Sequence, residues 1–196
     1  MALGIHPWYI PDDAEEFLSA LSDTDFLGAS AIGEIGLDTA DEKIPLERQI
    51  RVFEAQLALA EAMRLPSVVH CRGAFSELMQ CAERIGISRG AVIHAFNGSA
   101  ELAKDLGRRG FSFSFGGVLT FKDSQKRAAM LRSVYPERFL VETDSPDIPV
   151  AGRKGERNEP ARIVDIIEAA ASILGEPEER VAETAFSNAK RLFLRQ

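Results

Sequence analysis

Three short apolar stretches decide the fold: AIGEIGL at residues 31–37, SVVHC at residues 67–71 and AVIHAF at residues 91–96. Each is apolar at nearly every position, which is typical of a strand buried on both faces of a parallel sheet. A helical pattern follows the first stretch, because the apolar residues of Pro45–Arg64 recur at spacings of four and three. Strands that alternate with helices in this way predict an α/β protein.

The rest of the chain continues the alternation. Further strands are expected at Ala2–Ile5, Phe111–Phe115 and Phe139–Glu142, and helices at Asp12–Leu21, near Ala74–Ile85, Ala100–Arg109 and Ser124–Val134, at Glu159–Leu174 with Asn158 as N-cap, and as two short helices between Glu178 and Leu194. Six strand–helix units fit either a doubly wound sheet or a (β/α) barrel. We expect a single domain over residues 1–196.

Composition narrows the classes of partner. The 30 acidic and 23 basic residues give a net charge of −7, which argues against broad electrostatic binding to nucleic acid or to an anionic membrane. No apolar run reaches the roughly 20 residues of a membrane span, and the first residues lack the pattern of a signal peptide. Two cysteines do not make a disulfide framework. We therefore expect a cytoplasmic protein without a membrane partner.

Titratable residues interrupt the apolar strands near their carboxyl ends, where both architectures place ligands. They are His6, Glu34, His70, His94, Glu142 and Asp144, and they include all three histidines of the chain. Burying carboxylates without compensation is costly. Divalent cations provide that compensation, because carboxylate and imidazole groups suit zinc, manganese and similar ions. A metal site is therefore favoured over an inert network of polar groups.

Two further features leave two interpretations open, and a third argues against one kind of nucleophile. Glu34 lies between Gly33 and Gly36, which either leave room for an approaching group or mark a bulge or a close approach of backbone. Arg153 and Arg157, before the Asn158 helix, either bind an anion or are solvated loop charges. Cys71 adjoins His70, but neighbouring strand residues point to opposite faces, so a Cys–His nucleophile pair is not expected.

The motifs, taken in order, resemble the TatD family of metal-dependent deoxyribonucleases. The matching stretches are GIHP at residues 4–7, GEIGLD at 33–38, VVHCR at 68–72, VIHAFNGS at 92–99, FSFGGVLTFK at 113–122, LVETDSP at 140–146, RNEP at 157–160 and TAFSNAKRLF at 184–193. They cover nearly the whole chain, and their order is far more specific than any one of them. The resemblance implies a TIM-barrel-type fold with a metal site at its carboxyl-terminal rim, of which about six of the eight strand–helix units are present.

The resemblance also implies roles for individual residues. Glu34, His70, His94 and Asp144 would be ligands of one or two divalent ions (Mg, Mn or Zn), with Glu34 bridging. The catalytic residues would be Glu34 and Asp144, the latter as the base that orients a water molecule. The substrate DNA would be contacted by His6, Arg72, Arg153 and Arg157.

The chain departs from the family pattern at its beginning. The family's first strand carries a His-x-His pair that binds a metal, and no such pair occurs in the 196 residues. We therefore expect an N-terminally incomplete barrel: a fragment, a short natural form that completes itself by dimerising or swapping elements, or a short variant with a contracted sheet. With these ligands missing, one ion should bind weakly, and catalysis should be slow, dependent on a single metal or lost. The exposed sheet edges of the barrel would be covered by self-association.

Three functions follow from these features. The first is hydrolysis of phosphodiester bonds in DNA by a metal-activated water. The second is a non-catalytic descendant that binds nucleic acid or a protein partner. The third is an amidohydrolase-like enzyme that acts on a small ester or amide, because barrel metal sites carry out many chemistries.

Overall fold

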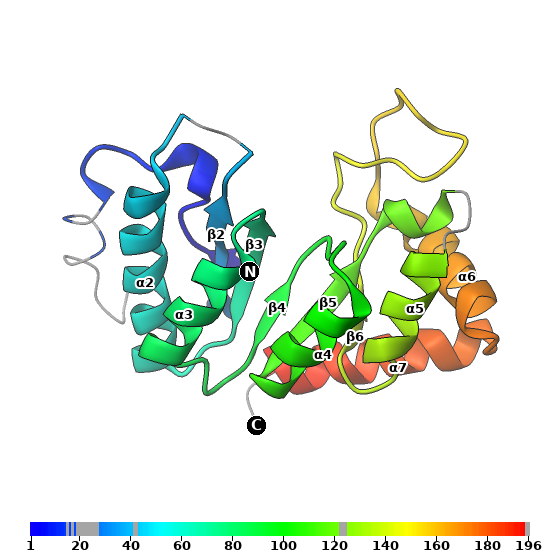
Figure 1. Cartoon of the computed structure of the whole chain (residues 1–196). Helices are drawn as coiled ribbons and strands as arrows, with labels where there is room; N and C mark the ends of the chain where they lie inside the picture. Colours follow the sequence, from blue (N-terminus) through cyan, green and yellow to red (C-terminus); the bar gives the residue numbers. More distant parts are fainter. Residues whose placement is uncertain (15, 17, 19–27, 41–42, 122–124, 195–196) are drawn as a thin grey trace. The chain divides into compact units, whose positions relative to one another are not determined.

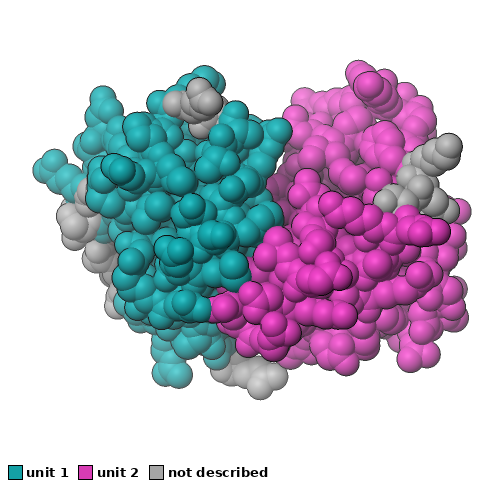
Figure 2. Space-filling model, viewed as in Figure 1, with its two compact units in different colours: residues 1–93, 192–196 teal, residues 94–191 magenta. Residues whose placement is uncertain are grey.

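The computed structural model describes residues 1–14, 16, 18, 28–40, 43–121 and 125–194. The chain divides into two compact units (Figure 2): unit 1 contains residues 1–93 with 192–196, and unit 2 contains residues 94–191. Each unit is described by itself below.

A parallel sheet of four strands forms the centre of unit 1 (Figure 1). Its strands lie side by side in chain order: β1 (Ala2–Leu3), β2 (Ala31–Asp38), β3 (Ser67–Arg72) and β4 (Ala91–Ile93). Seven of the eight residues of β2 are buried, as expected of a strand covered on both faces. The parallel pairing predicted from the apolar stretches is confirmed.

The helices α2 (Leu46–Met63) and α3 (Phe75–Ile85) cover this sheet, and the 3-10 turn η1 (Pro7–Tyr9) follows β1. Helix α2 packs on β2 and on α3. It begins after Pro45, whose missing N–H costs nothing at a helix start. Its buried residues are Gln49, Val52, Phe53, Gln56, Leu57 and Ala60, so two amides belong to the face turned to the core.

Unit 2 contains the parallel pair β5 (Phe111–Phe115) and β6 (Phe139–Val141) and the helices α4 (Ala100–Arg108), α5 (Gln125–Val134), α6 (Ile163–Leu174) and α7 (Glu178–Phe193). Short 3-10 turns η3 (Gly117–Thr120) and η4 (Pro160–Arg162) complete it. Phenylalanines fill its core: Phe96 packs on Phe113 at 4.6 Å and Phe115 stacks on Phe139 at 5.9 Å between ring centroids. The alternating FSFSF pattern is therefore a core strand.

Two predictions about the C-terminal helices were wrong. The two short helices expected between Glu178 and Leu194 are one continuous helix, α7, because no glycine or proline interrupts it and Val181, Ala185 and Asn188 form one buried face. The helix expected from Glu159 begins as the 3-10 turn η4. Asn158 does not cap it as predicted, because its Oδ1 accepts from the adjacent backbone N–H of Glu159 at 2.9 Å instead of from an N–H inside the first turn. The helix predicted at Asp12–Leu21 lies largely outside the described residues.

The described helices give no sign of a membrane span: none is long and apolar enough to cross a bilayer.

The two glycines beside Glu34 make room for strand β3. A Cβ atom at Gly33 would lie 2.6 Å from Cβ of Val68, and one at Gly36 would lie 1.9 Å from the carbonyl oxygen of His70. Gly36 also has a φ of +151°, and the register of β2 against β3 shifts between Ile32 and Ile35. Of the two interpretations left open by the sequence, the bulge with a close backbone approach is the observed one.

A methyl group at Gly36 should therefore separate β2 from β3. We expect Gly36→Ala to lower the free energy of unfolding by about 3 kcal/mol, because the clash is with backbone and cannot be relieved by a side-chain rotation. Urea unfolding followed by circular dichroism measures this. Gly152→Ala is the matched control, since Gly152 also has a positive φ (+81°) but open space around it. Equal losses in both variants would refute the close approach.

Candidate metal centre

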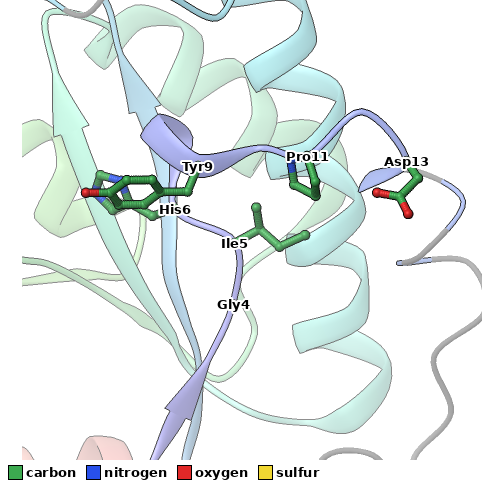
Figure 3. A pocket seen from close by; sticks show the side chains of 6 residues that line it. All are labelled: Gly4, Ile5, His6, Tyr9, Pro11 and Asp13. Atoms are coloured by element: carbon green, nitrogen blue, oxygen red, sulfur yellow. The ribbon is translucent and has the colours of Figure 1, made fainter.

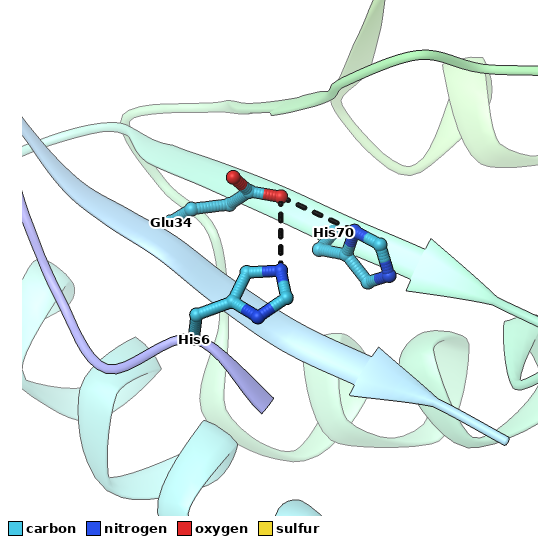
Figure 4. Close-up of side chains that lie close together, drawn as sticks. All are labelled: His6, Glu34 and His70. Carbon is cyan, nitrogen blue, oxygen red and sulfur yellow. Dashed lines mark ion pairs between the residues drawn. The ribbon is translucent and has the colours of Figure 1, made fainter. Parts of the chain in front are cut away.

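Three side chains from three segments of unit 1 converge on one point (Figure 4). His6 follows β1, Glu34 lies in the middle of β2, and His70 lies near the end of β3. Oε1 of Glu34 is 3.5 Å from Nε2 of His6 and 3.2 Å from Nδ1 of His70. The histidine side chains are only 18% and 14% exposed. Sequence reasoning placed Glu34 and His70 in a metal site and gave His6 to the substrate; the structure groups all three.

A buried carboxylate stands behind His70. Asp38 ends β2 and is fully buried. Its Oδ2 lies 2.8 Å from Nε2 of His70 and accepts a hydrogen bond from the indole Nε1 of Trp8 at 2.8 Å, and its Oδ1 accepts from the backbone N–H of Ala40 at 2.8 Å. Burial by itself would raise the pKa of Asp38, but these hydrogen bonds outweigh it and the pKa is lowered. The hydrogen bonds around Asp38 thus favour its charged form.

Helix α2 holds the segments that carry these groups through two buried glutamines. The side chain of Gln49 accepts from the backbone N–H of Asp38 at 2.8 Å and donates to its carbonyl at 3.0 Å. Gln56, two turns further on, does the same for Ile5, at 2.6 and 3.1 Å. Ile5 precedes His6, so one helix face fixes the backbone beside His6 and at Asp38.

A second histidine–carboxylate pair lies in unit 2. Nδ1 of His94 is 3.5 Å from Oε1 of Glu142. Glu142 also accepts a hydrogen bond from the backbone N–H of Ala95 at 2.6 Å and another from the hydroxyl of Ser114. Glu142 follows β6, and the carboxylate is held by groups at the ends of two other segments of the same unit. Sequence reasoning noted Glu142 at this strand end but assigned it no role.

Asp144 lies two residues beyond Glu142, with a left-handed backbone (φ +56°). Asn158 ties the surrounding loop together: its amide donates to the carbonyls of Thr143 at 2.6 Å, Asp147 at 2.8 Å and Ile148 at 3.2 Å. The loop carbonyls thereby gain a partner from a buried side chain. The asparagine of the RNEP stretch is thus the brace of the segment that carries Asp144.

The remaining candidate residues are three exposed arginines and a cysteine whose thiol stays protonated. Arg72, Arg153 and Arg157 are exposed, and Arg153 pairs with Glu156 at 2.9 Å, as solvated loop charges do. Their roles toward a substrate stay predictions. Burial raises the pKa of the Cys71 thiol to about 12, so it stays protonated at neutral pH. This agrees with the expectation that Cys71 is not a nucleophile.

The His6–Glu34–His70 group fits a divalent cation. Each residue offers one ligand atom, and these atoms lie within 4.8 Å of one another. Two ligand atoms that share one ion at about 2 Å each lie roughly 3–4 Å apart, as the Glu34 oxygen does from each histidine nitrogen. Two imidazoles and a carboxylate are donors that zinc, manganese and iron accept. The arrangement does not single out one ion.

A pocket opens beside His6 (Figure 3). It has a volume of about 380 Å³ and is lined by Gly4, Ile5, His6, Tyr9, Pro11 and Asp13. The ring of Tyr9 lies 5.8 Å from that of His6, between centroids, and Tyr9 is 74% exposed. This volume is within the range of small-molecule sites.

The fold and the donor set fit an α/β protein that binds a metal ion. Comparison with known proteins shows which family the chain belongs to. The model of the family described as "TatD related DNase" matches residues 1–194. The uncharacterized metal-dependent hydrolase YabD of Bacillus subtilis is 36% identical over 197 residues, which cover 98% of this chain and 76% of YabD. An uncharacterized metal-dependent hydrolase of Haemophilus influenzae is 33% identical, with 97% of this chain and 76% of that protein covered.

Comparison with solved structures points to the same family. The crystal structure of YjjV, a TatD homologue from Escherichia coli K12, matches 100% of this chain and 76% of its own, with a TM-score of 0.89 and 28% identity. The chain therefore belongs to the TatD related DNase family. It is a metal-dependent hydrolase of TIM-barrel-type fold, as the motifs predicted.

Proposed function

We propose that the protein hydrolyses phosphodiester bonds in DNA with a divalent cation held by His6, Glu34 and His70. The observation that carries the proposal is the convergence of these three ligand atoms. The family description, TatD related DNase, supports DNA as the substrate. When bound, a divalent cation would polarise a phosphoryl oxygen and lower the pKa of a water molecule.

The residues of the chain supply the other requirements. Glu34 provides the negative charge that retains a cation, and the neutral imidazoles of His6 and His70 add nitrogen donors. The pocket beside His6 offers space for a nucleotide next to these groups, with the exposed ring of Tyr9 as one wall. Since the chain carries a net charge of −7, attraction of the phosphate depends on local positive charge, for which Arg72 at the end of β3 remains our candidate.

Asp144 is the proposed general base. Its carboxylate would take a proton from the attacking water, which is the role given to it by the TatD resemblance. His94 is the proposed further ligand. Its Nδ1 is turned to Glu142, so Nε2 is the nitrogen that would bind.

The test is hydrolysis of labelled single-stranded and duplex oligonucleotides by the chelator-treated protein, with Mg²⁺, Mn²⁺ or Zn²⁺ added back. We expect no cleavage without a cation and recovery with at least one of the three. A small ester and a small amide serve as parallel substrates. Turnover of either without cleavage of DNA would replace the proposal by the amidohydrolase-like function. Tight DNA binding without turnover under every condition would replace it by the non-catalytic one.

A further inference from the structure

We infer that Asp38 is a positioning residue that fixes the tautomer of His70, so that Nδ1 offers its lone pair toward Glu34. The inference rests on the proposed metal site. It gives Asp38, which is not one of the proposed metal ligands, a role in that site. A histidine that binds a metal through one nitrogen commonly donates the other N–H to a carboxylate, which sets the tautomer and ring orientation.

The hydrogen bonds of Asp38 determine where the proton of His70 lies. Both oxygens of Asp38 already receive an N–H donor, so the carboxylate acts as an acceptor and a further group at the same oxygen must donate to it. Trp8 Nε1 and the Ala40 backbone are donors by nature, and both reach Asp38 at 2.8 Å. Nε2 of His70, also at 2.8 Å, must then carry its proton toward Asp38. In the neutral ring this leaves Nδ1 as an acceptor.

That tautomer has a consequence at Glu34. Nδ1 of His70 lies 3.2 Å from the Glu34 carboxylate oxygen, so a neutral His70 would set two acceptors against each other. A positive charge between them, a proton or a cation, relieves this opposition. The hydrogen bond to Asp38 thus makes the His70–Glu34 pair favour a bound positive charge.

Asp38 cannot yield its position easily. It is fully buried, and the side chain of Gln49 binds both its backbone N–H and its carbonyl. The three donors occupy both carboxylate oxygens: Oδ2 serves His70 and Trp8, and Oδ1 serves Ala40. The isosteric amide of Asn cannot reproduce this pattern. In one orientation its NH₂ opposes the Ala40 N–H, and in the other it opposes Trp8 and makes Nε2 of His70 an acceptor.

The direct test is nitrogen NMR of the protein labelled with ¹⁵N-histidine, at about pH 8.5, where histidines are ordinarily neutral. The chain has only three histidines, so a His70→Gln variant assigns the signal. We expect Nε2 of His70 to be protonated both in the metal-free and in the Zn²⁺-loaded protein. An unprotonated Nε2 in the metal-free wild type would overturn the inference, whatever the variants do.

Two variants separate positioning from general structural damage. We expect Asp38→Asn to move the proton of His70 away from Nε2 or to lower Zn²⁺ affinity about 10–100-fold, measured by calorimetry. Trp8→Phe removes one donor to the same oxygen but keeps the His70–Asp38 bond, so the proton should stay on Nε2. Loss of the Nε2 proton in Trp8→Phe, or unchanged affinity and tautomer in Asp38→Asn, would contradict the inference.

The outcomes also distinguish this inference from the proposed function. A protonated Nε2 in a protein that binds no cation would sustain the role of Asp38 and end the metal proposal. Cation-dependent DNA hydrolysis by a protein whose His70 Nε2 is unprotonated would sustain the metal proposal and end the proposed role of Asp38.

Discussion

Replacing Glu34 by glutamine is expected to lower kcat/KM for DNA hydrolysis by roughly a thousandfold, which corresponds to the several kcal/mol of charge stabilisation that a catalytic cation supplies. Glu34 gives the His6–Glu34–His70 group its only negative charge, and the amide keeps the size of the side chain while removing that charge. Cation affinity should fall with the rate. Initial rates on a labelled oligonucleotide and calorimetric titration with Mn²⁺ measure the two effects.

The control for this variant is Glu137→Gln, the same chemical change at an exposed position in unit 2. It should leave both the rate and the cation affinity unchanged. Full activity in Glu34→Gln, with wild-type affinity for Mn²⁺, would show that the observed cleavage comes from elsewhere, such as a copurified nuclease.

The second large effect is expected for Asp144→Asn, which should lower kcat by about 10²–10⁴-fold. An amide cannot accept the proton of the attacking water, whereas the brace from Asn158 holds the backbone of the loop in either variant. The same titration with Mn²⁺ separates two roles for Asp144. If Asp144 acts only as a general base, Asp144→Asn should lower kcat and leave the cation affinity unchanged. If Asp144 also binds the cation, the cation affinity should change together with kcat.

Asp147→Asn is the matched control for Asp144→Asn. Asp147 is an exposed carboxylate in the same loop, three residues further along. Its loss should change kcat by less than about twofold. Equal losses at both positions would point to a disturbed loop rather than to a base at Asp144.

The strands were readable from sequence because they are buried on both faces. Ser67–Arg72 and Phe111–Phe115 are found within one residue of the predicted bounds. Helix α2 also has nearly its predicted bounds, but its buried face contains Gln49 and Gln56, which a search for apolar periodicity passes over. Those glutamines are buried because they pair with the backbone of other segments, and that pairing is a tertiary property.

The residues of the candidate metal site could be predicted only in part from the sequence. Glu34 and His70 stood out as polar residues within apolar strands, and they do lie together. Asp38 was missed because it follows the last apolar residue of β2, where an acidic residue is ordinarily exposed; a carboxylate at the end of a buried strand next to a histidine strand was the available signal. The resemblance placed His6 against the substrate, and its approach to Glu34 in β2 is a tertiary contact that the short strand before it does not reveal.

Anomalous scattering from a crystal soaked in Mn²⁺ tests the central claim most directly. The observed arrangement of three donor atoms predicts an anomalous peak, from one Mn²⁺ ion, within bonding distance of Nε2 of His6, Oε1 of Glu34 and Nδ1 of His70. Well-ordered side chains at these positions with no peak among them, in a crystal that binds Mn²⁺ elsewhere, would contradict it.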